Sequence, residues 1–244
     1  SALGDRLVRA VSLEPKAVVR MGLALAIGRA KTYPTFVGLV DLMRREPDYR
    51  VVCNAIRSMS NYPYKMAAPV LYDWLKNKNL HIANTTAQYF VDNGSSLDAG
   101  FYWRMAKDTI ASSTQNKMYT AAHKYMGNSY SQYKDMINNE LFSKFQRTQN
   151  PYEKAEILRA LAAYPWNYKN VRNFGYKDPN LVVKSAAVEA LGDICKMPNF
   201  WSYFGYTNSK RVRFEIFEYL VEAINGGDPA MVAAAAVALR EPNP

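Results

Sequence analysis

Cysteine and histidine are scarce in this sequence, and their scarcity argues against most of the chemistry that proteins build from side chains. The 244 residues contain two cysteines, Cys53 and Cys195, and two histidines, His81 and His123. A metal site or a nucleophile paired with histidine needs several such groups to converge, and these four are widely separated along the chain. We therefore expect no metal, no cofactor and no catalytic residue, and we expect both histidines to pack or to face solvent.

Long apolar runs are missing as well. No stretch of about 18 apolar residues could span a bilayer, and residues 1–10 lack the pattern of an export signal. Nor does a glycine-rich loop offer a phosphate site, because Gly226-Gly227 precedes Asp228-Pro229 and indicates a turn between helices. We expect a folded chain without a membrane span. Its two thiols are expected to be unpaired, which fits oxidising and reducing compartments alike.

Positive charge is in excess but is spread along the chain. The formal net charge is +10, and the two halves divided after residue 122 carry excesses of seven and three. The longest basic run is Lys210, Arg211 and Arg213. A positive field attracts nucleic acid, anionic lipid or acidic protein, but a diffuse excess is typical of a solvated helical surface. Composition therefore leaves nucleic acid open as a partner without favouring it.

A unit of 32 residues recurs in the first half of the sequence. Glu14-Pro15 and Glu46-Pro47 are 32 residues apart, Lys78-Asn79 follows at the same spacing, and each opens a run with apolar residues at helical spacing. Proline and an acidic neighbour suit the first turn of a helix. Apolar positions in the second half of each unit repeat at the same spacing. Each unit is therefore predicted to be a pair of helices.

The pairing continues to the end of the chain in shorter units. Phe174-Gly175-Tyr176 recurs as Phe204-Gly205-Tyr206 after 30 residues, each at the expected end of a second helix. No alternating strand pattern followed by a two-residue turn is present, so no sheet is expected. The sequence predicts one all-α domain over 1–244, with about seven antiparallel helix pairs at residues 14–45, 46–77, 78–109, 110–147, 148–177, 178–207 and 208–240.

The segment DPNLVVKSAAVEALGDI, from Asp178 to Ile194, resembles the HEAT signature, in which Asp-Pro is followed by paired branched residues, small residues and Ala-Leu-Gly. The resemblance covers nearly the whole chain, best at 14–28, 46–60 and 178–194. It implies an armadillo-like α-solenoid, a superhelix of stacked helix pairs whose second helices line a concave surface. The last helix, from Asp228 to Arg240, has almost no polar outer face, so we expect this chain to be a segment of a longer protein.

HEAT-like arrays share a shape rather than an activity, so the expected function is a non-catalytic scaffold that binds a protein or peptide partner on a concave helical face. The run from Asn79 to Asp108 resembles the HEAT-repeat arm fused to cyclophilin-type peptidyl-prolyl isomerases in some bacterial proteins. That resemblance implies an isomerase active site in a separate β-barrel, and a place in the cell envelope or periplasm. Without it, we expect a cytoplasmic protein. The identity of the partner and the oligomeric state stay open.

Aromatic residues are unusually dense late in the chain, where ten lie within 43 residues, from Tyr164 to Tyr206. One interpretation is that they fill space beside short second helices. The other is that several rings stay exposed on the groove face, where amphipathic aromatics bind peptides and pair with cations. The candidate partner-binding residues are Trp166, Lys169, Arg172, Tyr176, Trp201, Tyr203, Tyr206 and Arg211.

A rival interpretation is an enzyme. HEAT-like DNA glycosylases, which excise alkylated bases, are similar in length, helix-pair architecture and basic charge. They hold duplex DNA in a basic groove, with aromatics and a carboxylate at the damaged nucleotide. Asp73 with Trp74, or Trp103 with Arg104, would imitate such a cluster. A concentrated positive groove with a buried carboxylate among tryptophans would favour this alternative. A HEAT protein that binds a chromophore or another small ligand is a third hypothesis, for which no motif is present.

Overall fold

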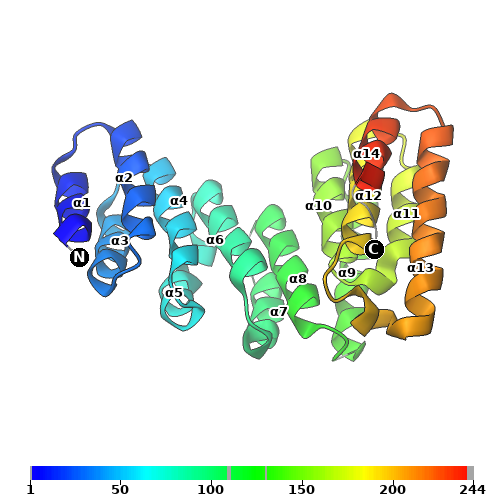
Figure 1. Ribbon diagram of the computed structural model, residues 1–244, viewed down its shortest axis with the longest axis horizontal. Helices are drawn as coiled ribbons and strands as arrows, with labels where there is room; N and C mark the ends of the chain where they lie inside the picture. The colour runs from blue at the N-terminus through cyan, green and yellow to red at the C-terminus, as the bar shows by residue number, and fades with distance from the viewer. Residues whose placement is uncertain (1, 109–110, 130, 241–244) are drawn as a thin grey trace. The chain divides into compact units, whose positions relative to one another are not determined.

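The computed structural model describes residues 2–108, 111–129 and 131–240, and every regular element in these ranges is helical (Figure 1). Fourteen α-helices and four 3-10 helices are present among the described residues, and no strand occurs among them. The chain is therefore all-α, as the sequence predicts. The described residues form two compact units, unit 1 within Ser1–Ser95 and Asp108–Met118 and unit 2 within Ser96–Lys107 and Tyr119–Pro244.

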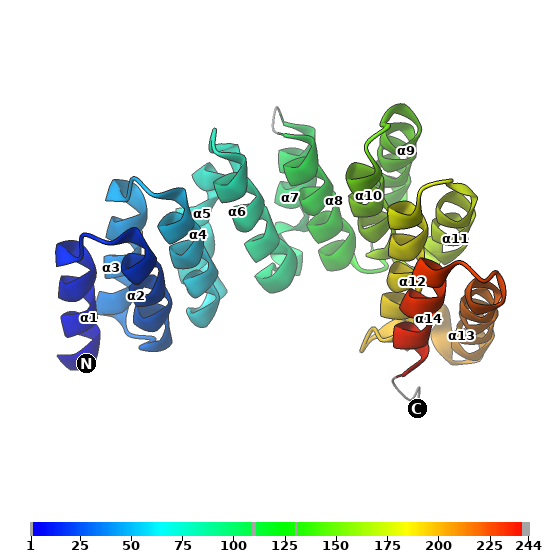
Figure 2. The ribbon, with the colours of Figure 1, turned by 90° about the horizontal axis from the view of Figure 1, so that it is seen from above.

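In unit 1 the first helices of successive pairs pack side by side. Helix α2 packs against α4, and α4 packs against α6 in turn, while α1 covers α2 and α3 (Figure 2). The elements of unit 1 are α1 (Ala2–Leu13), α2 (Ala17–Arg29), α3 (Tyr33–Arg45), α4 (Tyr49–Ser58), η1 (Met59–Asn61), α5 (Tyr64–Leu71), η2 (Tyr72–Lys76), α6 (Leu80–Asn93) and, as far as Met118, α8 (Ser112–Met126).

Unit 2 has the same kind of row. Helix α10 packs against α12 and α12 against α14, with α11 beside α12 and α13 against both α12 and α14. Besides the end of α8, the elements of unit 2 are η3 (Ser96–Asp98), α7 (Ala99–Lys107), α9 (Ser131–Arg147), α10 (Pro151–Ala162), η4 (Pro165–Asn167), α11 (Tyr168–Lys177), α12 (Leu181–Cys195), α13 (Phe200–Asn225) and α14 (Pro229–Arg240).

A repeated cap determines where the first helices begin. The side chain of the N-cap residue accepts a hydrogen bond from the backbone N–H two residues later, which satisfies a donor that the helix leaves unpaired. These N-cap residues are Asp48, Asn79, Asn150 and Asn180. The side chain two residues before each cap accepts the N–H of the cap residue itself, and these earlier residues are Glu46, Asn77, Thr148 and Asp178.

The caps correct one detail of the sequence interpretation. Pro47 and Pro179 were expected in the first helical turn, but each lies one residue before the N-cap, and α4 and α12 begin two residues after the proline. Only α10 and α14 have a proline as their first residue. Polar side chains on both sides of Pro47 and Pro179 take the hydrogen bonds that define these helix starts.

Two partly buried ion pairs occupy equivalent places in the two units. Arg20 of α2 donates to both carboxylate oxygens of Glu46, each at 2.8 Å, and Glu46 immediately precedes the start of α4. Lys154 of α10 contacts Asp178 at 2.7 Å, just before the start of α12. Both cations stand four residues after their own N-cap position. The same polar contact therefore joins one first helix to the next in each unit.

Five of the expected segments each contain two described α-helices, and the last two share α13. These five are the segments from 14–45 to 148–177, and the boundary at 109 and 110 lies outside the described residues. The boundary expected between 207 and 208 falls inside α13. Within α13 only Gly205 departs from helical geometry, with φ 70° and ψ 165°. Residues 206–225 form a single segment that packs against α12 and α14.

Candidate binding groove

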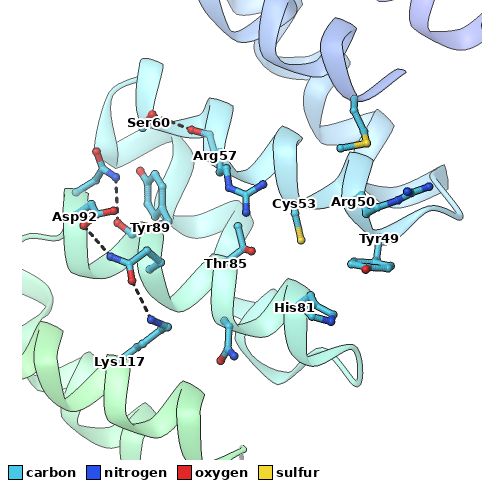
Figure 3. Close-up of a pocket in the computed structure, with 14 residues that line it drawn as sticks. Tyr49, Arg50, Cys53, Arg57, Ser60, His81, Thr85, Tyr89, Asp92 and Lys117 are labelled. Atoms are coloured by element: carbon cyan, nitrogen blue, oxygen red, sulfur yellow. Dashed lines mark hydrogen bonds between the residues drawn. The ribbon is translucent and has the colours of Figure 1, made fainter. Parts of the chain in front are cut away.

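Unit 1 contains an open groove of about 570 Å³ on the side of its first helices (Figure 3). We call it the unit 1 groove. Its lining residues are Met21 of α2, Tyr49, Arg50, Cys53 and Arg57 of α4, Ser60 of η1, His81, Asn84, Thr85, Gln88, Tyr89, Asp92 and Asn93 of α6, and Lys117 of α8. First helices supply nearly all of these side chains, whereas the sequence analysis expected second helices to form the binding surface.

Helix α4 presents two arginines to this groove. Arg50, Cys53 and Arg57 are spaced by three and four residues, so they share one face of the helix. Arg50 is held by Asp48, with its Nε at 3.0 Å from Oδ1 and its Nη2 at 2.7 Å from Oδ2. These hydrogen bonds lower the pKa of Asp48 to about 2. Arg50 thus has a carboxylate partner within its own helix start.

Arg57 is oriented differently, by neutral groups. Its Nη1 donates to Oδ1 of Asn54 at 2.7 Å, and Nδ2 of Asn54 donates to the carbonyl of Met21 on α2 at 3.2 Å. In Figure 3 the side chains of Arg57 and Cys53 project from α4 toward α6, where Thr85 lies. The guanidinium therefore faces the groove while hydrogen-bonded to an amide.

One end of the groove is closed by stacked rings. The imidazole of His81 on α6 lies parallel to the ring of Tyr49 on α4, with centroids 4.9 Å apart and planes inclined by 20°. Both side chains are exposed. The expectation that His81 faces solvent or packs is met in both respects, and the stack links the first turns of two successive first helices.

The other end carries a polar network. Lys117 Nζ donates to Oε1 of Gln88 at 3.1 Å, and Nε2 of Gln88 donates to Oδ1 of Asp92 at 2.9 Å. Asn84 accepts a hydrogen bond from Thr114 Oγ1 at 2.7 Å. Amides, hydroxyls and cations of this kind can bind the backbone and charged side chains of an extended segment. Within the described part of the chain, no three His, Cys, Asp or Glu side chains gather as metal ligands.

The basic residues predicted for partner binding lie in unit 2, where carboxylates of α13 pair with them. Lys169 and Arg211 both contact Glu215, at 3.4 Å and 2.9 Å, and Arg172 contacts Glu222 at 2.5 Å. The side chains of Lys169 and Arg172 thereby connect α11 to α13. The structure brings all three cations into intramolecular ion pairs.

The predicted aromatic residues divide between interior and surface. Tyr203 is buried, and Tyr176 is half-buried and donates its hydroxyl to the carbonyl of Tyr219 at 2.7 Å. Trp201 and Tyr206 are 65% and 78% exposed on either side of Gly205. Trp166 is 43% exposed and packs against Phe204, with ring centroids 4.5 Å apart. Some of these rings therefore fill space and three remain accessible, and their role in partner binding stays a prediction.

The two clusters considered for DNA repair differ from the arrangement that such chemistry needs. Asp73 is exposed and Trp74 is half-buried in η2. Trp103 and Arg104 line a pocket of about 310 Å³ in unit 2, and Nζ of Lys107 lies 4.5 Å from the Trp103 ring centroid. The described residues that line this pocket include no carboxylate.

No motif in the sequence pointed to the unit 1 groove. The available signal was the seven-residue spacing of Arg50 and Arg57 on one apolar helix, but the facing residues of α6 and α8 are distant in sequence. No described helix has the length and apolar character needed to cross a membrane.

A scan against models of protein families and a search of curated proteins find no match to this chain. Functional inference therefore depends on the groove and on the helices that form it.

Proposed function

We propose that this chain is an α-solenoid of about seven HEAT-like helix pairs and that it binds a peptide segment of a partner protein in the unit 1 groove. The proposal joins two observations. First helices pack in succession in each unit, and the same cap and ion pair recur at their starts. Such arrays present extended surfaces to partners.

The unit 1 groove carries the functional part of the proposal. Four first helices, α2, α4, α6 and α8, contribute to its lining, and its side chains offer hydrogen-bond donors and acceptors along its length. A cavity of about 570 Å³ accommodates a few residues of an extended chain. If the array is the accessory arm of a peptidyl-prolyl isomerase, the groove would hold a segment of the isomerase's substrate.

Peptide selection tests this function without knowledge of the natural partner. Random peptides displayed on phage are selected on the wild-type chain, and each enriched peptide is then assayed on Thr85→Trp, which places an indole in the groove. We expect the enriched peptides to lose binding to Thr85→Trp and to keep binding to Val18→Trp, a change at an exposed residue of α2 outside the groove. No enrichment, or equal binding to both variants, would overturn the proposal.

The DNA glycosylase hypothesis remains the alternative, supported by the net charge of +10. It predicts that nucleic acid co-purifies with the chain and is released by nuclease and by high salt. A duplex containing an alkylated base, incubated with the purified chain, would yield free base only if this alternative holds. The accessible tryptophan pocket in unit 2 is the place to substitute first, at Trp103.

A further inference from the structure

The cations of the unit 1 groove differ in how their charge is compensated. Arg50 is paired with Asp48. Arg57 donates to the amide oxygen of Asn54, and Lys117 donates to the amide oxygen of Gln88. Amide oxygens orient these two cations but carry no formal charge. Asp92 is the one carboxylate among the described residues that line the groove, so the groove carries an excess of positive charge that faces open space.

Gln88 bridges that carboxylate and the ammonium group of Lys117. Its Nε2 donates to Asp92 Oδ1 at 2.9 Å while its Oε1 accepts from Lys117 Nζ at 3.1 Å. A direct ion pair between Lys117 and Asp92 would cancel both charges, whereas the intervening amide keeps the ammonium group directed toward a neutral oxygen. Lys117 is thus positioned but not neutralised, as is Arg57 on the opposite side of the groove.

The spacing of the arginines defines a length for the ligand. Arg50 and Arg57 are seven residues apart on α4, which is about 10 Å along a helix axis. An extended chain in the polyproline II conformation advances about 3.1 Å per residue with three residues per turn, so side chains about three residues apart lie on one side at this interval. Carboxylates at that spacing on one segment could approach both guanidinium groups.

We propose that the ligand of the unit 1 groove is an extended acidic segment of a protein, with Asp or Glu side chains about three residues apart that pair with Arg57, Lys117 and Arg50. This inference rests on the proposed function, because it assumes that the groove binds peptide. Charge complementarity selects an acidic peptide over a basic one, since Arg57 and Lys117 would repel cationic side chains.

An acidic protein segment fits the groove better than nucleic acid does, because the groove offers few positive charges. Nucleic-acid affinity grows with the number of phosphates neutralised, and this groove offers few cations and one opposing carboxylate. The Tyr49 and His81 rings also stack on each other, with centroids 4.9 Å apart. This leaves their faces less available for stacking on nucleic-acid bases. Amide and hydroxyl groups along the groove suit a peptide backbone.

Fluorescence anisotropy with defined probes tests the proposal. The first probe is a labelled peptide of about twelve residues made of serine, glycine and glutamate, with glutamate at every third position. The second has glutamine in place of glutamate, and the third is a single-stranded oligodeoxynucleotide of similar length. We expect the glutamate peptide to bind the wild-type chain, and its affinity to fall as salt rises from about 50 to about 300 mM. The glutamine peptide should not bind.

Variants then assign the binding to the groove. Arg57→Gln and Lys117→Gln should each weaken binding of the glutamate peptide about threefold, and the double variant should weaken it about tenfold, as expected for partly exposed ion pairs. Arg44→Gln is the matched control, because Arg44 is exposed on α3 of the same unit and does not line the groove. Circular dichroism melting of each variant verifies that the fold is retained.

The possible outcomes separate the two proposals. Equal binding of the glutamate and glutamine peptides, or equal effects of Arg57→Gln and Arg44→Gln, would overturn the acidic ligand. Tighter binding of the oligodeoxynucleotide, lost in Arg57→Gln and Lys117→Gln, would assign the groove to nucleic acid instead. Enriched phage peptides that require an open groove but lack acidic residues would retain the proposed function and refute this inference alone. If neither the peptides enriched on phage nor the glutamate peptide loses binding to Thr85→Trp, both proposals fail.

Discussion

His123 is a titratable side chain that folding removes completely from water. It is 0% exposed in α8, and its Nδ1 lies 2.8 Å from the carbonyl oxygen of Ala160 on α10. Burial, together with the positive charge of Lys134, lowers the pKa of His123 to about 4. The neutral imidazole, donating through Nδ1–H to Ala160, is therefore the form that the folded chain holds.

Acid should destabilise the fold through this residue. The folded pKa of about 4 lies below the ordinary value of 6.5, so the unfolded chain binds the proton first as pH falls. The free energy of unfolding should fall as pH drops from about 6.5 to about 4, by about 3 kcal/mol at most, and His123 should contribute no pH dependence above about 7. Urea unfolding across this range measures the slope.

His123→Asn should flatten that slope, because an asparagine amide can still donate to Ala160 but does not titrate. His81→Asn is the control, since His81 is exposed on α6 and its replacement leaves the buried site unchanged. A slope in His123→Asn as steep as that of the wild-type chain would show that other groups cause the acid sensitivity.

Lys134 is the clearest case of a buried charge in unit 2. Its side chain is 1% exposed, its Nζ lies 4.0 Å from the ring centroid of Tyr164, and burial lowers its pKa to about 8. The ring compensates only part of the lost hydration. Lys134→Met keeps the length of the side chain and removes the charge, so it should raise the free energy of unfolding by about 1 to 3 kcal/mol at neutral pH.

The comparison for Lys134→Met is Lys177→Met, at an exposed position of α11 in the same unit. That change should shift the urea midpoint little. Lys134→Met should also raise the pKa of His123, because it removes a neighbouring positive charge, and so narrow the pH window of acid destabilisation. A loss of stability in Lys134→Met would mean that the ring contact outweighs the cost of burying the ammonium.

At the scale of elements, glycines determine how closely neighbouring helices approach. A Cβ on Gly28 of α2 would lie 2.5 Å from Cβ and 3.2 Å from Cα of Ser58 on α4, whereas a Cβ on Gly22 of the same helix would meet nothing within 4 Å. Gly28→Ala should therefore destabilise the fold by about 1 to 3 kcal/mol, because atoms next to the backbone must shift.

Gly22→Ala is the matched substitution and should act in the opposite direction. Alanine restricts the unfolded chain and favours the helix, so we expect a gain of about 0.5 to 1 kcal/mol. Denaturant unfolding of both variants measures the two signs. Equal effects would indicate that helix propensity alone decides, and that α2 can move away from α4 without cost.

The helix pairs could be predicted from sequence because periodicity and caps are local signals. Asp48 and Asn180 start helices through their own side chains, and no distant residue is needed to read them. The Phe-Gly-Tyr tripeptides show where such reading fails. A Cβ on Gly175 would lie 2.1 Å from that of Ala187, so this glycine allows α11 to pack closely against α12. Gly205 has a φ of 70° and kinks α13. Identical neighbours cannot distinguish these two roles.

The unit 1 groove was less predictable, because its lining comes from several helices. Arg50 and Arg57 lie on one helical face in any interpretation of the sequence, but the groove also requires His81, Gln88 and Lys117 from other helices. Basic residues near the late aromatics looked equally suitable, yet Glu215 and Glu222 pair with them in the structure. Packing between helices decides which cations keep an uncompensated charge. The spacing of residues in the sequence carries no information about that packing.

At the scale of the whole molecule, a repeat array has a consequence that a single globular core does not share. Each repeat contacts its neighbours, so its stability is close to a sum of local terms, and damage stays local. Two glycine substitutions probe this at separate places. Gly28→Ala disturbs the contact of α2 with α4, and Gly192→Ala would place a Cβ 2.7 Å from that of Ala238, between α12 and α14.

Hydrogen exchange followed by mass spectrometry should therefore show two separate patterns. In Gly28→Ala, exchange should quicken in peptides from α2 and α4 while peptides from α12 and α14 keep the wild-type rate, and Gly192→Ala should give the reverse. Gly22→Ala serves as the comparison in α2 and should not quicken exchange in any of the four helices, because its added methyl group meets no neighbour. If either substitution quickens exchange equally in all four helices, the chain unfolds as one cooperative body, and the proposal of a HEAT-like array would lose its energetic basis.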